Sequence, residues 1–358
     1  MIKRYKVFII ILISTSVFLL DFIFTKLAIK PIFDKTILRV KHDVYHHSLL
    51  PNIDKIEFSS KVGYWRIITN SLGFRDKENR NISLNKNNYR IVLIGDSVTE
   101  GVLLDWRDTF PGMLEENLSK KDIQVLNAGV TSYSPSIYYS KIKYYLNKGF
   151  EFDELFVFID VSDIEDEAII YRIKNSKIIS IDQKLEQNII NKNFKVNLIN
   201  FLHQNLNLTF HILKKIEDLF FDQNLEDFLI NLNKSKRYNY THNNISLKEY
   251  QLGFDNSFLS MSKLNDLCKK NNIKLNVVIY PSLLQFYNNE ISSIYVKNWT
   301  KFSEKNSINL INLFPIFLEE YDKKDILKII KKYFLHLDVH FNKEGNKLIS
   351  DYILKSNF

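Results

Sequence analysis

Two short segments, far apart in the chain, carry side chains that could together perform acyl transfer. The first is the run Arg90 to Gly101, RIVLIGDSVTEG, in which Ser97 follows an apolar stretch and a glycine. The apolar residues before Gly95 predict a buried strand, and a helix that begins at Ser97 would present free backbone N–H groups at its first turn. Because the N-terminal end of a helix stabilises negative charge, the Ser97 hydroxyl is a candidate nucleophile and its own N–H a candidate oxyanion donor.

The second segment supplies a base for that serine. It is the run LDVHFNKEG at residues 337–345, which contains Asp338 and His340. Imidazole titrates near neutral pH, so His340 can take the serine proton, and a neighbouring carboxylate such as Asp338 can fix its tautomer and stabilise the imidazolium. Asn342 is a candidate N-cap for a last helix that ends near Leu354.

These residues resemble the conserved blocks of the SGNH/GDSL hydrolase superfamily. The first block is matched by Gly95, Asp96, Ser97 and Gly101. The second block is similar to residues 125–129, VLNAG, and the resemblance implies that Gly129 gives a second oxyanion N–H. The likeness covers residues 88–160 and 255–358.

Two of the blocks depart from the pattern of the superfamily. Where the family has Gly-x-Asn-Asp, residues 160–163 read DVSD, so Ser162 stands at the position of the asparagine that serves as a third oxyanion donor. A serine hydroxyl can donate one hydrogen bond, but it is shorter than an asparagine amide and rotates freely. In the last block one residue, Val339, separates Asp338 from His340, whereas the family more often has two.

The residues and the resemblance together predict a serine-dependent ester hydrolase that forms an acyl-enzyme on Ser97. The expected substrates are acyl esters, in particular O-acylated glycans or lipids of the cell envelope. A sugar hydroxyl in place of water would make the same site an O-acyltransferase. A third alternative is a catalytically silent module that binds glycan or scaffolds an assembly, motivated by Ser162 and by the short Asp338–His340 spacing. The expected chemistry uses no cofactor and no metal ion.

The alternation of apolar runs and amphipathic segments predicts an α/β fold, a doubly wound, flavodoxin-like parallel sheet. Strands are expected at 91–94, 123–127, 154–160, 274–279 and 308–311, and helices near 109–120, 135–148, 257–271, 289–304 and 342–355. Ser97, Gly129 and Ser162 each follow a strand end, where active sites of such sheets lie. An extra strand is expected within 64–75, and helices near 196–216 and 224–233.

The N-terminus predicts a membrane anchor. Lys3, Arg4 and Lys6 precede an apolar run over residues 7–24, long enough to nearly span a hydrocarbon core, and no small-x-small cleavage site follows. We therefore expect an uncleaved transmembrane signal anchor at 7–24, with Asp21 solvated near the far interface. Residues 1–6 would form a cytoplasmic tail, and the catalytic domain would lie on the extracytoplasmic side of the cytoplasmic membrane.

The predicted domain organisation continues with a juxtamembrane extension, 25–87, and a hydrolase-like domain, 88–358, which contains an insertion at about 164–250. The whole chain has 358 residues, 45% of them hydrophobic, enough for one sizeable domain with additions.

Composition narrows the classes of partner. Cys268 is the single cysteine, which excludes an intrachain disulfide, and we expect it to be a buried, inert thiol. The net charge of +8 comes from scattered lysines without an arginine and aromatic cluster, so no nucleic-acid partner is expected. The histidines at 42, 46 and 47 are expected in a solvated loop, and Arg75 in a salt bridge. No protein partner can be named from the sequence.

Overall fold

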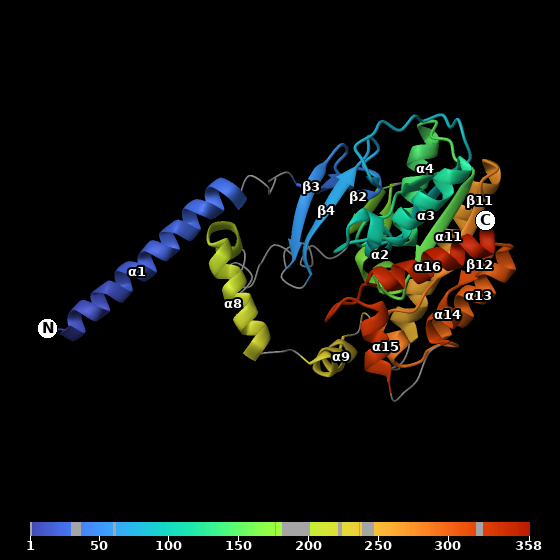
Figure 1. The fold of residues 1–358 in the computed structure, drawn as a ribbon. Helices are drawn as coiled ribbons and strands as arrows, with labels where there is room; N and C mark the ends of the chain where they lie inside the picture. The colour runs from blue at the N-terminus through green and yellow to red at the C-terminus, as the bar shows by residue number, and fades with distance from the viewer. Residues whose placement is uncertain are drawn as a thin grey trace.

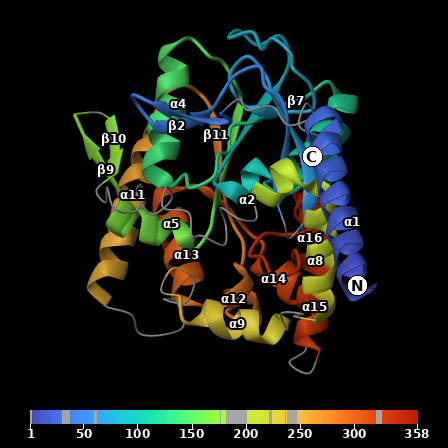
Figure 2. The same ribbon diagram turned by 90° about the vertical axis from the view of Figure 1, so that its left-hand side faces the viewer.

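A computed structural model describes residues 2–29, 37–59, 62–175, 177–180, 201–220, 224–235, 237, 247–319 and 325–358. Its centre is an eight-stranded sheet in the order β12-β11-β8-β6-β7-β5-β4-β3. The strands are β3 (Asp54–Ser59), β4 (Gly63–Thr69), β5 (Arg75–Asp76), β6 (Arg90–Ile94), β7 (Gln124–Asn127), β8 (Glu154–Ile159), β11 (Lys274–Ile279) and β12 (Asn309–Asn312). The chain runs through this sheet with helices on both sides (Figures 1 and 2).

The five predicted strands form the parallel part of the sheet. Strand β6 pairs in parallel with β7 on one side and with β8 on the other, and β11 joins β8 to β12. Numbered along the chain, these strands stand in the order 2-1-3-4-5, which is the flavodoxin-like arrangement of a doubly wound sheet. The α/β fold expected from the sequence is therefore confirmed for this part of the chain.

Helices cover the parallel strands on both faces. On one face α3 (Phe110–Leu118) packs against α16 (Lys343–Asn357), and on the other α11 (Leu247–Lys270) packs against α4 (Pro135–Asn147) and α13 (Ile294–Asn306). Asn342 is the N-cap of α16, as predicted, and its side chain accepts from the N–H groups of Glu344 and Gly345. Cys268 lies buried in α11, and burial raises the pKa of its thiol to about 12.

The sheet is mixed rather than fully parallel, which corrects the sequence prediction. Strands β3, β4 and β5 pair antiparallel with one another, and β5 pairs antiparallel with β7. The connection between β3 and β4 is short, and short connections can join only antiparallel strands, because a parallel pair needs a long crossover. The expected extra strand is β4. The segment 25–87 thus contributes three strands to the central sheet.

The segment 164–250 adds several small elements. It contains a π-helical turn, η5 (Asp166–Ile170), and a hairpin of β9 (Tyr171–Lys174) and β10 (Lys177–Ser180). Two helices follow, α8 (Asn207–Phe220) and α9 (Leu225–Asn233), the second where the sequence predicts one. Residues 201–205 are also helical, while the start of the helix predicted near 196–216 lies outside the described residues.

The N-terminal helix α1 (Ile2–Phe24) projects away from the sheet (Figure 1). By length and composition the segment Ile11–Ile29 could cross a membrane, and most of it is exposed. Asp21 corrects the prediction of a solvated carboxylate, because it is only 4% exposed. Its oxygen atoms accept hydrogen bonds from the backbone N–H groups of Leu208 at 3.0 Å and Thr209 at 2.8 Å, so α1 caps the first turn of α8.

Replacing Asp21 with alanine is expected to loosen that first turn. The loss of a capping carboxylate costs about 1 kcal/mol, so the amides of Leu208 and Thr209 should exchange about fivefold faster with solvent deuterium. Hydrogen-exchange mass spectrometry of the full chain in detergent measures this directly, with the amides of α9 as an internal reference. Unchanged exchange in α8 would contradict the capping role.

Candidate active site

The nucleophile segment leaves the sheet through a tight turn at the end of β6. Asp96 is the N-cap of the short helix α2 (Ser97–Glu100), and its carboxylate accepts from the Val98 N–H at 3.0 Å. A Cβ atom on Gly95 would lie 2.9 Å from the Phe158 carbonyl oxygen and would collide with the Thr99 side chain. The turn therefore requires glycine there, and it places Ser97 as the first residue of the helix.

Ser97, His340 and Asp338 lie in one hydrogen-bonded chain. The Ser97 Oγ is 2.8 Å from His340 Nε2, and His340 Nδ1 is 2.5 Å from Asp338 Oδ1. The side chains of His340 and Asp338 keep 19% and 13% of their surface exposed, so solvent reaches the site. A base that contacts the hydroxyl through one ring nitrogen and a carboxylate through the other is the arrangement that activates a serine.

A closed loop holds both residues of the C-terminal segment. An antiparallel bridge joins Phe334 to Phe341, and the Leu335 N–H donates to the His340 carbonyl at 2.9 Å. Asp338 Oδ1 also accepts from the backbone N–H of His340 at 3.2 Å. Because the loop bends back on itself, Asp338 and His340 contact each other although one residue separates them.

The predicted oxyanion donors differ in the hydrogen bonds that they form in this structure. Among the described residues, the Ser97 N–H at the first turn of α2 has no hydrogen-bond partner, as an oxyanion donor requires. The Gly129 N–H instead donates to Asn127 Oδ1 at 3.0 Å. A Cβ on Gly129 would lie 2.8 Å from Thr99 Cβ and 3.0 Å from the Glu100 nitrogen. Gly129 therefore also allows the close approach of α2, and its role as an oxyanion donor stays a prediction.

Ser162, the third predicted oxyanion donor, is also hydrogen-bonded in this structure. It is buried at the start of α5 (Ser162–Glu165), and both its N–H and its hydroxyl donate to Asp160 Oδ1 at 2.6 Å. A hydroxyl has one proton to donate, so in this arrangement the proton of Ser162 is directed to Asp160 and not toward an oxyanion. Asp160 precedes the helix and fixes the turn, a function that the sequence comparison with Gly-x-Asn-Asp does not predict.

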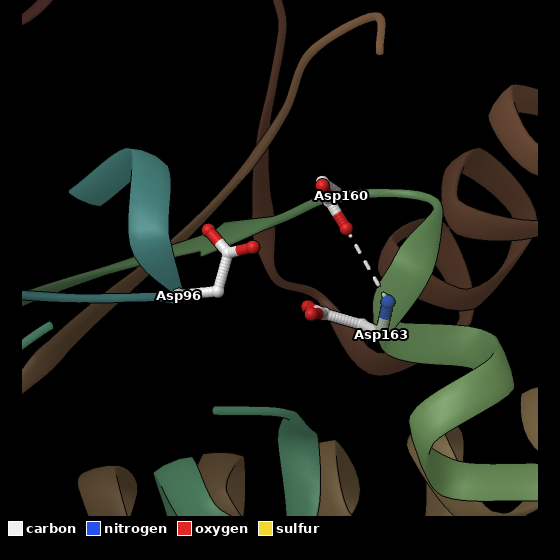
Figure 3. Close-up of side chains that lie close together, drawn as sticks. All are labelled: Asp96, Asp160 and Asp163. Carbon is white, nitrogen blue, oxygen red and sulfur yellow. Dashed lines mark hydrogen bonds between the residues drawn. The ribbon is translucent and has the colours of Figure 1, made fainter. Parts of the chain in front are cut away.

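Three buried carboxyl groups lie beside the nucleophile turn (Figure 3). Oxygen atoms of Asp96, Asp160 and Asp163 lie within 4.8 Å of one another. Burial, and then the charge of Asp160, raise the pKa of Asp96 to about 7, and burial raises that of Asp163 well above its usual range. Tyr138 donates to Asp163 Oδ2 at 2.9 Å. Carboxyl groups this close cannot all ionise at neutral pH, so the cluster holds protons.

Residues around α2 fix its position, and sequence analysis missed them. Arg75 is 1% exposed, and its guanidinium donates to backbone carbonyl oxygens, including Glu100 O at 2.8 Å, rather than forming the expected salt bridge. Burial lowers its pKa to about 10. The buried Glu100 carboxylate pairs with Arg39 and accepts from the Thr131 N–H at 2.7 Å, which ties α2 to the loop after β7. No sequence signal marks these contacts.

The three histidines near the N-terminus are not in a solvated loop, which corrects that expectation. His47 Nε2 lies 2.8 Å from the Thr131 carbonyl oxygen, and His46 Nδ1 lies 2.8 Å from His47 Nδ1. Burial lowers the pKa of His47 to about 3, so its ring is neutral at physiological pH. His42 stacks on Tyr45 with ring centroids 3.6 Å apart. The histidines are therefore packed against other residues: His47 contacts the loop after β7, and His42 contacts Tyr45.

No protein-family model and no curated protein matches this sequence. Solved structures do resemble it in fold. A psychrotrophic esterase from Pseudoalteromonas sp. is 11% identical, with a TM-score of 0.39 over 75% of this chain and 96% of that chain. A member of the lipolytic protein G-D-S-L family from Veillonella parvula DSM 2008 is 10% identical, with a TM-score of 0.39 over 75% and 98% of the two chains.

An acetyl xylan esterase from Geobacillus stearothermophilus is similar as well, at 9% identity and a TM-score of 0.40 over 76% of this chain and 96% of that chain. The fold and the site together define an α/β protein with a Ser–His–Asp chain at the carboxyl ends of its parallel strands. The superfamily that its sequence blocks resemble is that of the SGNH/GDSL hydrolases.

Adding one methyl group at Gly129 is expected to disturb the nucleophile turn. In Gly129→Ala the new Cβ meets the backbone and the branched side chain of α2, and overpacking of this kind costs about 1–3 kcal/mol. Urea denaturation should show that loss, with a parallel loss of reactivity at Ser97. An unfolding free energy equal to that of the natural chain would show that α2 can move away without cost.

The carboxyl cluster predicts a pH-dependent stability. The pKa of Asp96 in the folded state, about 7, is above its ordinary value of 3.8, so the folded state holds a proton that the unfolded chain releases. The stabilisation of the folded state by this proton is full below about pH 4. It is lost as the pH rises through 7, and the total loss is roughly 4 kcal/mol. In Asp96→Asn, which retains an N-cap residue, urea denaturation at pH 4.5, 6 and 7.5 should give a flatter profile. If the unfolding free energies of Asp96→Asn and of the natural chain changed with pH in parallel, the pH dependence could not be assigned to Asp96.

Proposed function

We propose that this protein is a serine-dependent ester hydrolase that acts through an acyl-enzyme on Ser97. The proposal rests on one observation, the continuous hydrogen-bonded chain from Ser97 Oγ through His340 to Asp338. The Ser97 N–H at the first turn of α2 supports it, because a free donor there can hold the developing oxyanion.

The reaction begins with proton transfer from Ser97 Oγ to His340 Nε2 while Oγ attacks the ester carbonyl carbon. Asp338 accepts from Nδ1–H and stabilises the imidazolium that forms. The tetrahedral intermediate places its oxyanion at the Ser97 N–H and collapses when His340 returns the proton to the departing alcohol. Water then attacks the acyl-enzyme, with His340 first as base and then as acid, and releases the carboxylic acid and Ser97.

The anchor and the site together favour substrates at a membrane. The segment 7–24 would hold the chain in the cytoplasmic membrane, with the catalytic domain on the extracytoplasmic side and residues 1–6 inside. In that position the accessible acyl esters are O-acylated glycans or lipids of the cell envelope. The hydrolase-like domain of this proposal includes the strands of residues 54–76, since they belong to the central sheet.

The decisive experiment is labelling with a fluorophosphonate probe, followed by peptide mass spectrometry. The full chain in detergent should be labelled at Ser97. Labelling should disappear in Ser97→Ala and His340→Ala, and it should slow roughly a thousandfold in Asp338→Asn, because that change favours the wrong tautomer of His340. Ser356→Ala, which changes an exposed serine of α16, serves as the matched control.

The result that overturns the proposal is a folded chain with no labelling above the Ser97→Ala background. If Ser97 is labelled, incubation with an acetylated glycan distinguishes the two acyl acceptors. Release of acetate identifies water as the acceptor. Transfer of acetyl groups to a second glycan would identify an O-acyltransferase that uses the same acyl-enzyme.

A further inference from the structure

A cavity on the flank of the molecule is lined by lysines that form no ion pair with the acidic residues that the structure describes. It has a volume of about 640 Å³ and lies between α4, the β9–β10 hairpin and α11. Four exposed lysines line it, and we call it the lysine groove after them: Lys143, Lys148, Lys177 and Lys263. The volume is within the range of clefts that bind ligands.

The charge of the lysine groove is uncompensated. No aspartate or glutamate is among the residues that line it, and within the described part of the chain none of the four lysines forms an ion pair. Some other basic side chains do form ion pairs, as Lys77 does with Glu115 at 2.7 Å and Lys274 with Glu154 at 2.7 Å. Four like charges around one cleft repel each other, and a bound anion would relieve that repulsion.

The elements of the lysine groove are fixed to the rest of the molecule. Helix α4 packs on α11, and the hairpin is joined to the turn after β1 (Arg39–His42) through a hydrogen bond from the Ile178 N–H to the Val44 carbonyl at 3.0 Å. Figure 2 shows α4, the hairpin and α11 on the same side of the molecule. Three separate elements thus provide the cations that line the cleft.

The groups that line the cleft beside the lysines indicate which anion fits. Tyr139 and Tyr144 line the cleft, but their ring faces are covered by lysines, with Lys143 Nζ 5.6 Å from the Tyr139 ring and Lys148 Nζ 4.5 Å from the Tyr144 ring. Covered rings do not offer the open stacking platforms that bind single-stranded nucleic acids, and no arginine lines the cleft to read bases. Its remaining polar groups include Ser140 and Asn147, which can bond to sugar hydroxyls.

We propose that the lysine groove binds a chain of an acidic polysaccharide, with carboxylate or phosphate groups on successive units facing the lysines. A cleft accepts part of a polymer chain, whereas a membrane surface would require a flat or convex face. The groove is formed by the C-terminal half of α4, so it is separate from the Ser97 turn. The site would hold the polymer beside the protein whether or not Ser97 acts on it.

The test measures binding of defined oligomers to the full chain in neutral detergent by isothermal titration calorimetry. The probes are an oligogalacturonate, which carries carboxylates, an oligo(glycerol phosphate), which carries phosphates, and a neutral dextran oligomer. We expect binding of one or both acidic oligomers and not of dextran, weakened strongly by 0.5 M salt. The acidic oligomer that binds more tightly identifies the anionic group that the lysine groove prefers.

Two pairs of substitutions with the same change in charge locate the site. Lys143→Gln combined with Lys263→Gln should weaken binding about twentyfold, since each lysine near a charged surface contributes roughly a factor of five. Lys120→Gln combined with Lys301→Gln removes two exposed lysines outside the groove and should change the affinity less than about twofold. Circular dichroism checks that both variants fold.

Several results would overturn the proposal. They are no binding of either acidic oligomer, an equal loss in the two paired variants, or tighter binding of single-stranded DNA or of anionic phospholipid vesicles than of the oligomers. Fluorophosphonate labelling of Ser97 should be unaffected in the Lys143→Gln and Lys263→Gln variant. A failure of the groove is therefore distinguishable from a failure of the proposed esterase reaction.

Discussion

The close approach of α2 to the ends of β6, β7 and β8 is the constraint on which the site depends. Gly95 and Gly129 face α2 from two sides, and at each a Cβ atom would be under 3.0 Å from atoms of Thr99. Protein interiors are close-packed, so a backbone pressed between two loops at this distance has one position available. The position of α2 sets the orientation of the Ser97 side chain, which is why its hydroxyl contacts a histidine that is 243 residues away in the chain.

Acidic side chains lie at the N-terminal end of α2, and arginines contact its C-terminal end. The carboxyl cluster of Asp96, Asp160 and Asp163 lies beside its N-terminus, while Arg75 and Arg39 contact its C-terminal end through Glu100. A helix carries a partial positive charge at its N-terminus and a partial negative charge at its C-terminus, so acids at the start and arginines at the end both lower its energy. The protons retained by the cluster limit the repulsion that three buried carboxylates would otherwise produce.

The N-terminal helical segment is joined to the rest of the molecule by polar contacts. Asp21 and Thr25 of the N-terminal helical segment bond to the first N–H groups of α8, with the Thr25 hydroxyl accepting from the Asn207 N–H at 2.9 Å. Helix α8 in turn meets the antiparallel edge of the sheet, where the rings of Phe58 and Phe210 lie 5.6 Å apart. Helix α1 and the sheet are thus connected through α8.

The sequence by itself determined the parallel strands, the helix that follows Asn342, and the two short segments that carry the candidate nucleophile and base. These features are local, because an apolar strand, a glycine turn and an N-cap each depend on a few consecutive residues. The chemistry of the predicted reaction also limits the alternatives, since a serine nucleophile needs a base and the segment 337–345 contains one.

The tertiary structure decided the rest. It engages the N–H of Gly129 and the hydroxyl of Ser162 in bonds to Asn127 and Asp160, it buries Asp21 as a cap, and it directs Arg75 to carbonyl oxygens instead of a carboxylate. It also adds three antiparallel strands to one edge of the sheet. Each of these outcomes depends on which donor lies nearest to which acceptor after the chain has folded. Distances between residues far apart in sequence are set by packing, and a linear pattern of residue types does not contain them.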